Sequence, residues 1–280
     1  MKKHNQKVIR NTDFIPEWKK SVSNHQSFRS IFKWGAKDEF KNPSQGFFSV
    51  IKQGLGLSDD DFQKPEKLGN NIVENTCKTA MSPADIVLFE NIVGKDNCFI
   101  DTYDRLKYST GKAMEDIFDL REEKIENISD IVLHPKNREE IQKILELCNT
   151  KKIPLHVYGG GSSVTLGLSC PRGGVTLVMN THMNKMIQFS EINRTITVEA
   201  GMMGPVYEDL LNDAPAKLDA DNNYTGGHFP QSFEYSTVGG WVVTLGSGQA
   251  SSYYGDAYDL VVSQEYITPQ IGRASCRERV

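Results

Sequence analysis

Residues 153–168 read IPLHVYGGGSSVTLGL, and this stretch decides the interpretation of the chain. A β-rich apolar run ends at Tyr158, and three glycines and two serines follow it at positions 159–163. Consecutive glycines can take positive φ values and present neighbouring backbone N–H groups to one anion. The stretch therefore predicts a strand that leads into a loop suited to a pyrophosphate.

The two best-known phosphate loops do not match this stretch. The dinucleotide pattern G-x-G-x-x-G needs a glycine at position 164, where the chain has Val164. A P-loop needs Gly-Lys-Ser or Gly-Lys-Thr after the glycines, and neither follows. Because glycine runs also occur in simple hairpin turns, that alternative stays open at this point.

A second segment argues against plain turns. Residues 231–248 read QSFEYSTVGGWVVTLGSG, in which small and hydroxylated residues are dense. Such residues let a backbone approach a bulky planar ligand while hydroxyls bond its polar edge. Trp241, Val242 and Val243 within the segment are too apolar for an exposed loop. The segment is therefore predicted to pack against something large.

The spacing of apolar residues predicts two regions. Apolar positions recur at helical spacing in residues 1–126, which are expected to be mainly helical. Residues 127–270 give a strand, a helix and then further strands, so they are expected to form one α+β domain. Its first helix should begin at Asn137, with Glu140 three residues later as in a capping box.

Local signals predict the starts of two more helices and the extent of one strand. Asp85 behind Pro83 indicates the start of one helix, and Ser109 or Thr110 is expected to cap a helix within residues 108–124. Residues 259–269, DLVVSQEYITP, read as the last strand.

The final ten residues, 271–280, read IGRASCRERV and follow no periodic or turn pattern. They resemble one translated frame of a sequencing adapter, so we expect a non-native tail and leave it out of the predicted fold. We also expect the chain to stop before the catalytic half of its protein and to be inactive alone.

Composition is that of an ordinary soluble globular protein. The chain has 38% hydrophobic residues, 24% charged residues and a net charge of −4, so no nucleic acid partner is expected. Neither a secretory signal nor a membrane-spanning run is evident, which predicts a cytoplasmic location. The five cysteines form no C-x-x-C pair and read as reduced thiols, so no metal site is expected.

Several motifs between about Tyr103 and Pro269 occur in an order that resembles one family. They are LREEKIENISDIVLHP, IPLHVYGGGSSVTLGL, MNTHMNKM, ITVEAG, GHFPQSFEYSTVGGW and SGQASSYYGDAYDLVV. The chain resembles the FAD-binding proteins of the vanillyl-alcohol oxidase type, and within them the alkyldihydroxyacetonephosphate synthases. This resemblance implies a two-subdomain FAD-binding fold, here incomplete, behind the helical region.

The resemblance also implies which residues bind the cofactor. The GGGSSV loop would cradle the FAD pyrophosphate, the segments QSFEYST and TLGS would lie along the flavin and its ribityl chain, and Glu199-Ala200-Gly201 would belong to the same wall. The cofactor-binding residues implied are Tyr158, Gly159, Gly160, Gly161, Ser162, Ser163, Val164, Gln231, Ser232, Phe233, Glu234, Tyr235, Ser236, Thr237, Gly240, Thr244, Gly246 and Ser247.

Three observations, on serine, histidine and leucine positions, refine this expectation. Members of the family that hold flavin covalently use a histidine in the loop after the glycines, where this chain has Ser162 and Ser163, so non-covalent FAD is expected. His228 is a better candidate for flavin contact than His156, which lies in a strand pattern. Leu245 stands where the synthase pattern usually has an arginine.

The function implied is that of an alkylglycerone-phosphate synthase of ether lipid synthesis, which exchanges an acyl for an alkyl chain with no net redox change of the flavin. A lipid-like substrate is expected, and peripheral membrane contact and a homodimer are compatible with the resemblance. The catalytic residues are expected outside this chain. Two alternatives stay open: an FAD-linked oxidase or dehydrogenase of a 2-hydroxy acid such as lactate or glycolate, and a non-enzymatic scaffold whose glycine loops are only turns.

Overall fold

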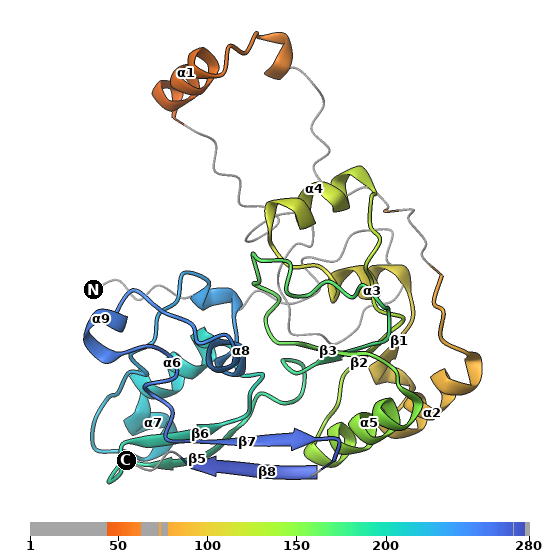
Figure 1. The fold of residues 1–280 in the computed structure, drawn as a ribbon. Helices are drawn as coiled ribbons and strands as arrows, with labels where there is room; N and C mark the ends of the chain where they lie inside the picture. Colours follow the sequence, from red (N-terminus) through yellow and green to blue (C-terminus); the bar gives the residue numbers. More distant parts are fainter. Residues whose placement is uncertain (1–43, 63–72, 74–77, 271, 278–280) are drawn as a thin grey trace.

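The computed structural model describes residues 44–62, 73, 78–270 and 272–277. It confirms an α+β fold whose amino-terminal part is mainly helical where the structure describes it, and the prediction for residues 1–43 lies outside the described residues. The helices of that part are α1 (Gln45–Gly54), α2 (Pro83–Val93), α3 (Thr102–Lys107) and α4 (Met114–Glu122). Figure 1 shows α1 apart from the sheets, α2 and α3 beside the central sheet, and α4 between α1 and the sheet.

Four short strands form the central sheet, in the order β1-β2-β4-β3. The strands β2 (Ile131–Leu133), β4 (Val175–Val178) and β3 (Leu155–Tyr158) run parallel, and β1 (Cys98–Phe99) pairs antiparallel with β2 at the edge. The carboxyl ends of three parallel strands therefore meet at one edge of the sheet, where ligands bind in open α/β sheets.

Helices α2 and α5 (Arg138–Lys151) cover one face of this sheet (Figure 1). Alternating strand residues such as Ile131 and Leu133 share a buried apolar cluster with Ile141 and Ile144 of α5. The opposite face carries a smaller cluster of Tyr108, Val132, Tyr158 and Val178. Since successive strand residues point to opposite faces, the central strands β2 and β4 are buried on both sides, whereas β3 at the edge is only partly buried.

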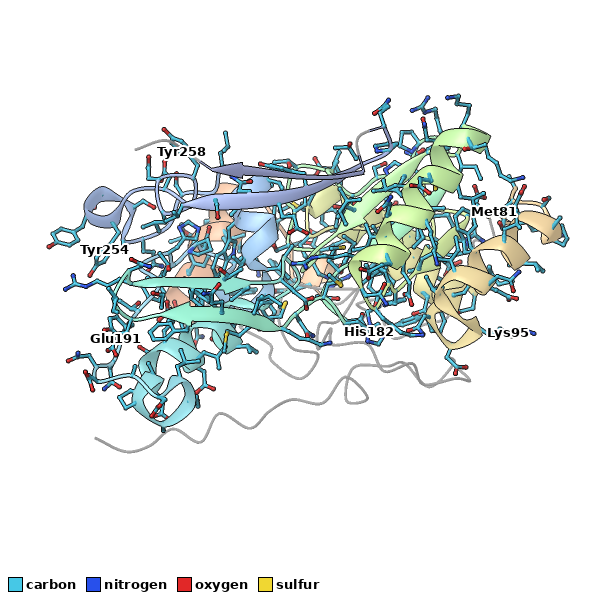
Figure 2. All side chains as sticks on the ribbon, turned by 90° about the horizontal axis from the view of Figure 1, so that it is seen from below. Met81, Lys95, His182, Glu191, Tyr254 and Tyr258 are labelled. Carbon is cyan, nitrogen blue, oxygen red and sulfur yellow. The ribbon has the colours of Figure 1, made fainter. Side chains whose placement is uncertain are left out.

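The remaining elements lie beside the central sheet (Figure 1). They are the hairpins β5 (Met186–Ser190) with β6 (Thr195–Val198) and β7 (Ser263–Thr268) with β8 (Gly272–Arg277), and the helices α6 (Gly204–Asn212), α7 (Ala214–Leu218), α8 (Val238–Val243) and α9 (Ser251–Tyr254). Three 3₁₀ turns, η2 (Asp60–Phe62), η3 (Lys95–Asn97) and η4 (Phe233–Tyr235), complete the described elements. Figure 2 shows Tyr254 and Tyr258 at one end of the molecule and Met81 and Lys95 at the other.

The predicted start of α5 is confirmed. The Asn137 side chain accepts a hydrogen bond from the Glu140 backbone N–H at 2.9 Å. The Glu140 carboxylate reaches back one residue further than a capping box requires, because it accepts from the backbone N–H of Lys136 at 2.8 Å.

Two predicted helix starts are wrong by a few residues. Helix α4 begins after Ala113 and not at Ser109 or Thr110. The Ser109 hydroxyl instead accepts from the Ser129 backbone N–H, and the Thr110 hydroxyl donates to the Leu106 carbonyl, so both are used elsewhere.

The start of helix α2 is the second prediction that is wrong. Its cap is Ser82, whose hydroxyl accepts from the Asp85 backbone N–H at 3.1 Å, and Asp85 lies inside the first turn. Pro83 occupies the first helical position, where its missing N–H costs nothing. The helix therefore starts two residues before the predicted residue.

The end of the chain also differs from prediction. Strand β7 begins at Ser263, whereas the strand was predicted from Asp259, whose carboxylate instead caps a turn by accepting from the Asp256 backbone N–H. Residues 272–277 were left out of the predicted fold, but their backbone pairs along the whole of β7. The origin of residues 271–280 stays a prediction, as does the domain boundary at residue 126.

Among the helices that the structure describes, none is both long enough and apolar enough to cross a membrane.

Candidate functional site: the glycine loop

The glycine loop, residues 159–163, begins where β3 ends. Tyr158 is buried at the end of the strand, and its ring packs edge-on against the Tyr108 ring with centroids 4.8 Å apart. Gly161 has φ +70°, and a Cβ there would overlap the Tyr158 hydroxyl. Only glycine therefore fits at position 161, both for its backbone conformation and for the tyrosine beneath it.

The loop lies directly against the second predicted segment. A Cβ on Gly160 would stand 2.7 Å from Cα of Ser236, and one on Gly159 would overlap the Thr237 hydroxyl. These contacts join residues more than 70 positions apart in the sequence. The tertiary fold thus brings together the two segments that were singled out separately.

The backbone N–H groups of the glycine loop are available to a ligand. None of the hydrogen bonds among the described residues is donated by a backbone N–H of residues 159–163, although Gly160 and Gly161 are buried. The carbonyl of Ser163 accepts from the Lys112 backbone N–H at 2.6 Å, which fixes the far end of the loop. Buried N–H groups are nearly always bonded in folded proteins, so the loop fits a pyrophosphate as acceptor.

The hydroxyl groups of the second segment have partners inside the protein. The Ser236 hydroxyl accepts from Nε1 of Trp241 at 2.6 Å and donates to the Ser232 carbonyl at 2.8 Å. The Thr237 hydroxyl accepts from the Gly240 backbone N–H at 3.2 Å and so caps α8. These bonds position the segment, and direct contact between these hydroxyls and the flavin stays a prediction.

The predicted site residues differ in how far they are exposed. Tyr158, Gly160, Gly161, Ser236 and Thr237 are buried. The half-buried ones are Gly159, Ser162, Ser163, Ser232, Phe233, Tyr235, Gly240 and Gly246. The exposed ones are Val164, Gln231, Glu234, Thr244 and Ser247. The buried residues lie where the glycine loop meets the second segment. The exposed residues come before or after them along the chain.

The predicted wall at Glu199-Ala200-Gly201 packs against α8. The Ala200 carbonyl accepts from the Gly239 backbone N–H at 2.8 Å, and the Met202 carbonyl accepts from the Val238 backbone N–H at 2.9 Å. A Cβ on Gly239 would overlap Ala200. The close approach explains why a glycine stands at position 239 and ties the wall to the second segment.

His228 is buried without a hydrogen-bond partner. Its side chain is 3% exposed, and within the described part of the chain neither ring nitrogen is bonded. The ring lies 5.1 Å from the Trp241 ring, centroid to centroid. Burial lowers the pKa of His228, with the Asp256 carboxylate opposing the shift, so the imidazole is held neutral. His156 likewise has an unbonded Nε2 atom.

Three residues near the carboxyl ends of the parallel strands were not named as site residues from the sequence: Tyr108, His134 and Asn180. His134 and Asn180 do lie within two of the motifs that carry the resemblance. The His134 ring lies 5.2 Å from that of Tyr108, and its Nδ1 atom is hydrogen-bonded to the Thr181 hydroxyl at 2.7 Å. His134 and Asn180 each come just after a parallel strand. This placement could have identified them as site residues from the sequence, because the carboxyl ends of parallel strands meet at one edge of the sheet.

Comparison with known proteins agrees with this geometry. The family described as "FAD binding domain" matches residues 129–273. Alkyldihydroxyacetonephosphate synthase of Caenorhabditis elegans is 32% identical over 221 residues, which is 77% of this chain and 34% of the relative. Glycolate oxidase subunit GlcD of Bacillus subtilis is 28% identical over 146 residues, covering 51% of this chain and 28% of the relative.

A solved alkyldihydroxyacetonephosphate synthase has the same fold over most of the described chain. It superposes with a TM-score of 0.66 at 26% identity, covering 74% of this chain and 39% of that structure. The chain spans 27% to 34% of the length of three curated alkyldihydroxyacetonephosphate synthases that it matches. The family match and the glycine loop lead to one conclusion: the chain belongs to the FAD-binding domain family and binds FAD.

Proposed function

We propose that this chain supplies the FAD-binding part of an alkylglycerone-phosphate synthase-like enzyme, which exchanges the acyl chain of a lipid-like substrate for an alkyl chain. The similarity to the synthase of Caenorhabditis elegans and to the solved synthase supports this reaction. The observation that carries the cofactor role is the glycine loop, whose N–H groups donate no hydrogen bond among the described residues and whose glycines pack closely against Tyr235 to Thr237.

The residues of this chain would hold the cofactor without a covalent bond. The N–H groups of residues 159–163 would donate to the pyrophosphate, and the close packing of Gly160 on Ser236 would fix the loop relative to the second segment. His228, neutral and buried beside Trp241, could hydrogen-bond a polar atom of the flavin. Bound FAD would supply the electron-accepting ring system that these side chains cannot provide.

A second candidate is an FAD-linked oxidase of a 2-hydroxy acid. The similarity to Glycolate oxidase subunit GlcD of Bacillus subtilis favours it. The two functions differ in the redox state of the flavin, because an oxidase reduces it in each cycle and the exchange reaction needs no electron acceptor. Anaerobic addition of glycolate or D-lactate should bleach the flavin absorbance of an oxidase and leave that of a synthase unchanged.

The first experiment is an absorbance spectrum of the purified chain before and after acid precipitation. Yellow colour released into the acid supernatant is expected for non-covalent FAD. Colour retained in the pellet would contradict the non-covalent assignment, and a chain that binds no added FAD would contradict the cofactor role. The exchange of acyl for alkyl chains, without an electron acceptor, should then be assayed in a protein that also carries the family's remaining length.

A further inference from the structure

Asn180 has a buried side-chain amide and is not among the cofactor-binding residues named above. Its side chain is 1% exposed, and in the part of the chain that the structure describes neither Oδ1 nor Nδ2 has a hydrogen-bond partner. Leaving a buried polar group unbonded costs roughly 1 to 3 kcal/mol per group. An amide with two unbonded atoms at such a position points to a ligand that completes it.

Asn180 lies at the strand edge that bears the glycine loop. It comes two residues after β4, and the preceding residue, Met179, donates its backbone N–H to the Tyr158 carbonyl at 2.9 Å. The following residue, Thr181, is hydrogen-bonded to His134, whose ring packs on Tyr108. The Asn180 backbone is therefore held next to the point where β3 passes into the loop.

The turn that contains Asn180 does not need its amide. The Met183 backbone N–H closes the turn by donating to the Met179 carbonyl at 3.0 Å. Asn184 adds a second brace, since its Nδ2 atom donates to the Asn180 carbonyl at 3.0 Å and to the Thr181 carbonyl at 3.2 Å. The bonds that fix the local backbone thus leave the Asn180 side chain free for another use.

We propose that the Asn180 side-chain amide binds FAD in its diphosphate and ribose portion, as a cofactor-binding residue at the strand edge that bears the glycine loop. Nδ2 can donate to a phosphate oxygen, and Oδ1 can accept from a sugar hydroxyl. This inference rests on the FAD site described above and adds a contact from β4 to those of the glycine loop and the second segment.

The test is Asn180→Leu, which keeps the branching of the side chain and removes both polar atoms. If Asn180 serves the cofactor, the chain without FAD should keep or raise its melting temperature, because an unbonded buried amide has been removed. The dissociation constant for FAD, from fluorescence titration of the cofactor-free chain, should rise roughly 10-fold to 100-fold, as for a lost hydrogen bond to a charged group.

Asn184→Leu is the matched control four residues along. It removes an amide that braces the turn through two hydrogen bonds to backbone carbonyls, so it should lower the melting temperature of the cofactor-free chain. Of the two leucine variants, only Asn184→Leu should therefore lower the melting temperature. Asn180→Ala serves as a second variant should leucine prove too large, and it should weaken FAD binding to a similar extent.

The outcomes of these experiments separate a contact between Asn180 and FAD from a structural role of Asn180. FAD binding unchanged in both Asn180→Leu and Asn180→Ala would overturn the contact while leaving the cofactor site intact. A fall in melting temperature of Asn180→Leu as large as that of Asn184→Leu, with unchanged affinity for FAD, would make Asn180 a structural residue. A wild-type chain that bound no FAD would overturn the cofactor assignment itself, and this contact with it.

Discussion

Replacing Gly160 by alanine should separate the glycine loop from the second segment. A Cβ at this position would lie 2.7 Å from Cα of Ser236 and 2.9 Å from the carbonyl carbon of Tyr235, and both neighbours are backbone atoms. Carbon atoms pack at about 3.5 to 4.0 Å, so the two segments would have to move apart by about 1 Å. Backbone cannot rotate away as the end of a flexible side chain can.

The magnitude follows from the cofactor contacts that this movement breaks. A shift of about 1 Å takes an N–H···O bond out of its normal range of roughly 2.7 to 3.2 Å. Losing two such bonds to a charged pyrophosphate, at about 1.5 kcal/mol or more each, weakens FAD binding by about 100-fold or more. Overpacking alone should lower the free energy of unfolding by about 1 to 3 kcal/mol.

Fluorescence titration with FAD and thermal unfolding of the cofactor-free chain measure the two effects separately. Gly174→Ala is the control for lost stability. A Cβ there would stand 2.9 Å from the Pro154 carbonyl carbon, and the φ of +88° adds backbone strain, but the position lies at the opposite end of β4 from the loop. This control should be less stable and, in the folded state, bind FAD within about threefold of wild type. The reasoning is refuted if Gly160→Ala binds FAD as tightly as Gly174→Ala does.

Three other predictions concern stability. Lys152 ends α5 with a left-handed φ of 58°, so Lys152→Gly should raise the free energy of unfolding by about 1 kcal/mol in urea titration, and no increase would contradict the strain. Thr237→Val removes the cap bond to the Gly240 backbone N–H and should cost about 1 kcal/mol, whereas Thr237→Ser should keep most of it; equal losses would exclude the cap. The pKa of His228 is lowered by burial from 6.5, so the unfolded chain gains a proton first and stability should fall as pH drops below 6.5. His228→Leu should make unfolding measured against pH less acid-sensitive, and an unaltered pH profile would count against this origin.

The sequence predicted whether a segment is a helix or a strand better than it predicted the residues where that element begins and ends. Asn137 and Glu140 gave the start of α5 because a side-chain cap is a local interaction, read within three residues. Ser109 and Thr110 do not cap the helix because their hydroxyls bond Ser129 in the loop before β2 and Leu106 in the preceding helix, and helix propensity cannot report such competition. The strand pairing of residues 272–277 was likewise invisible in a segment with no periodic pattern.

What the sequence determined by itself is the loop chemistry: a strand that ends in glycines and serines can present N–H groups to a phosphate whatever surrounds it. Only the tertiary structure decided what the loop packs against. Parallel pairing placed Asn180 and His134 at the same strand edge as Gly159. The second segment packs against the glycine loop at Ser236. Such contacts depend on distant residues meeting in space, and the spacing of residues along the chain contains no record of them.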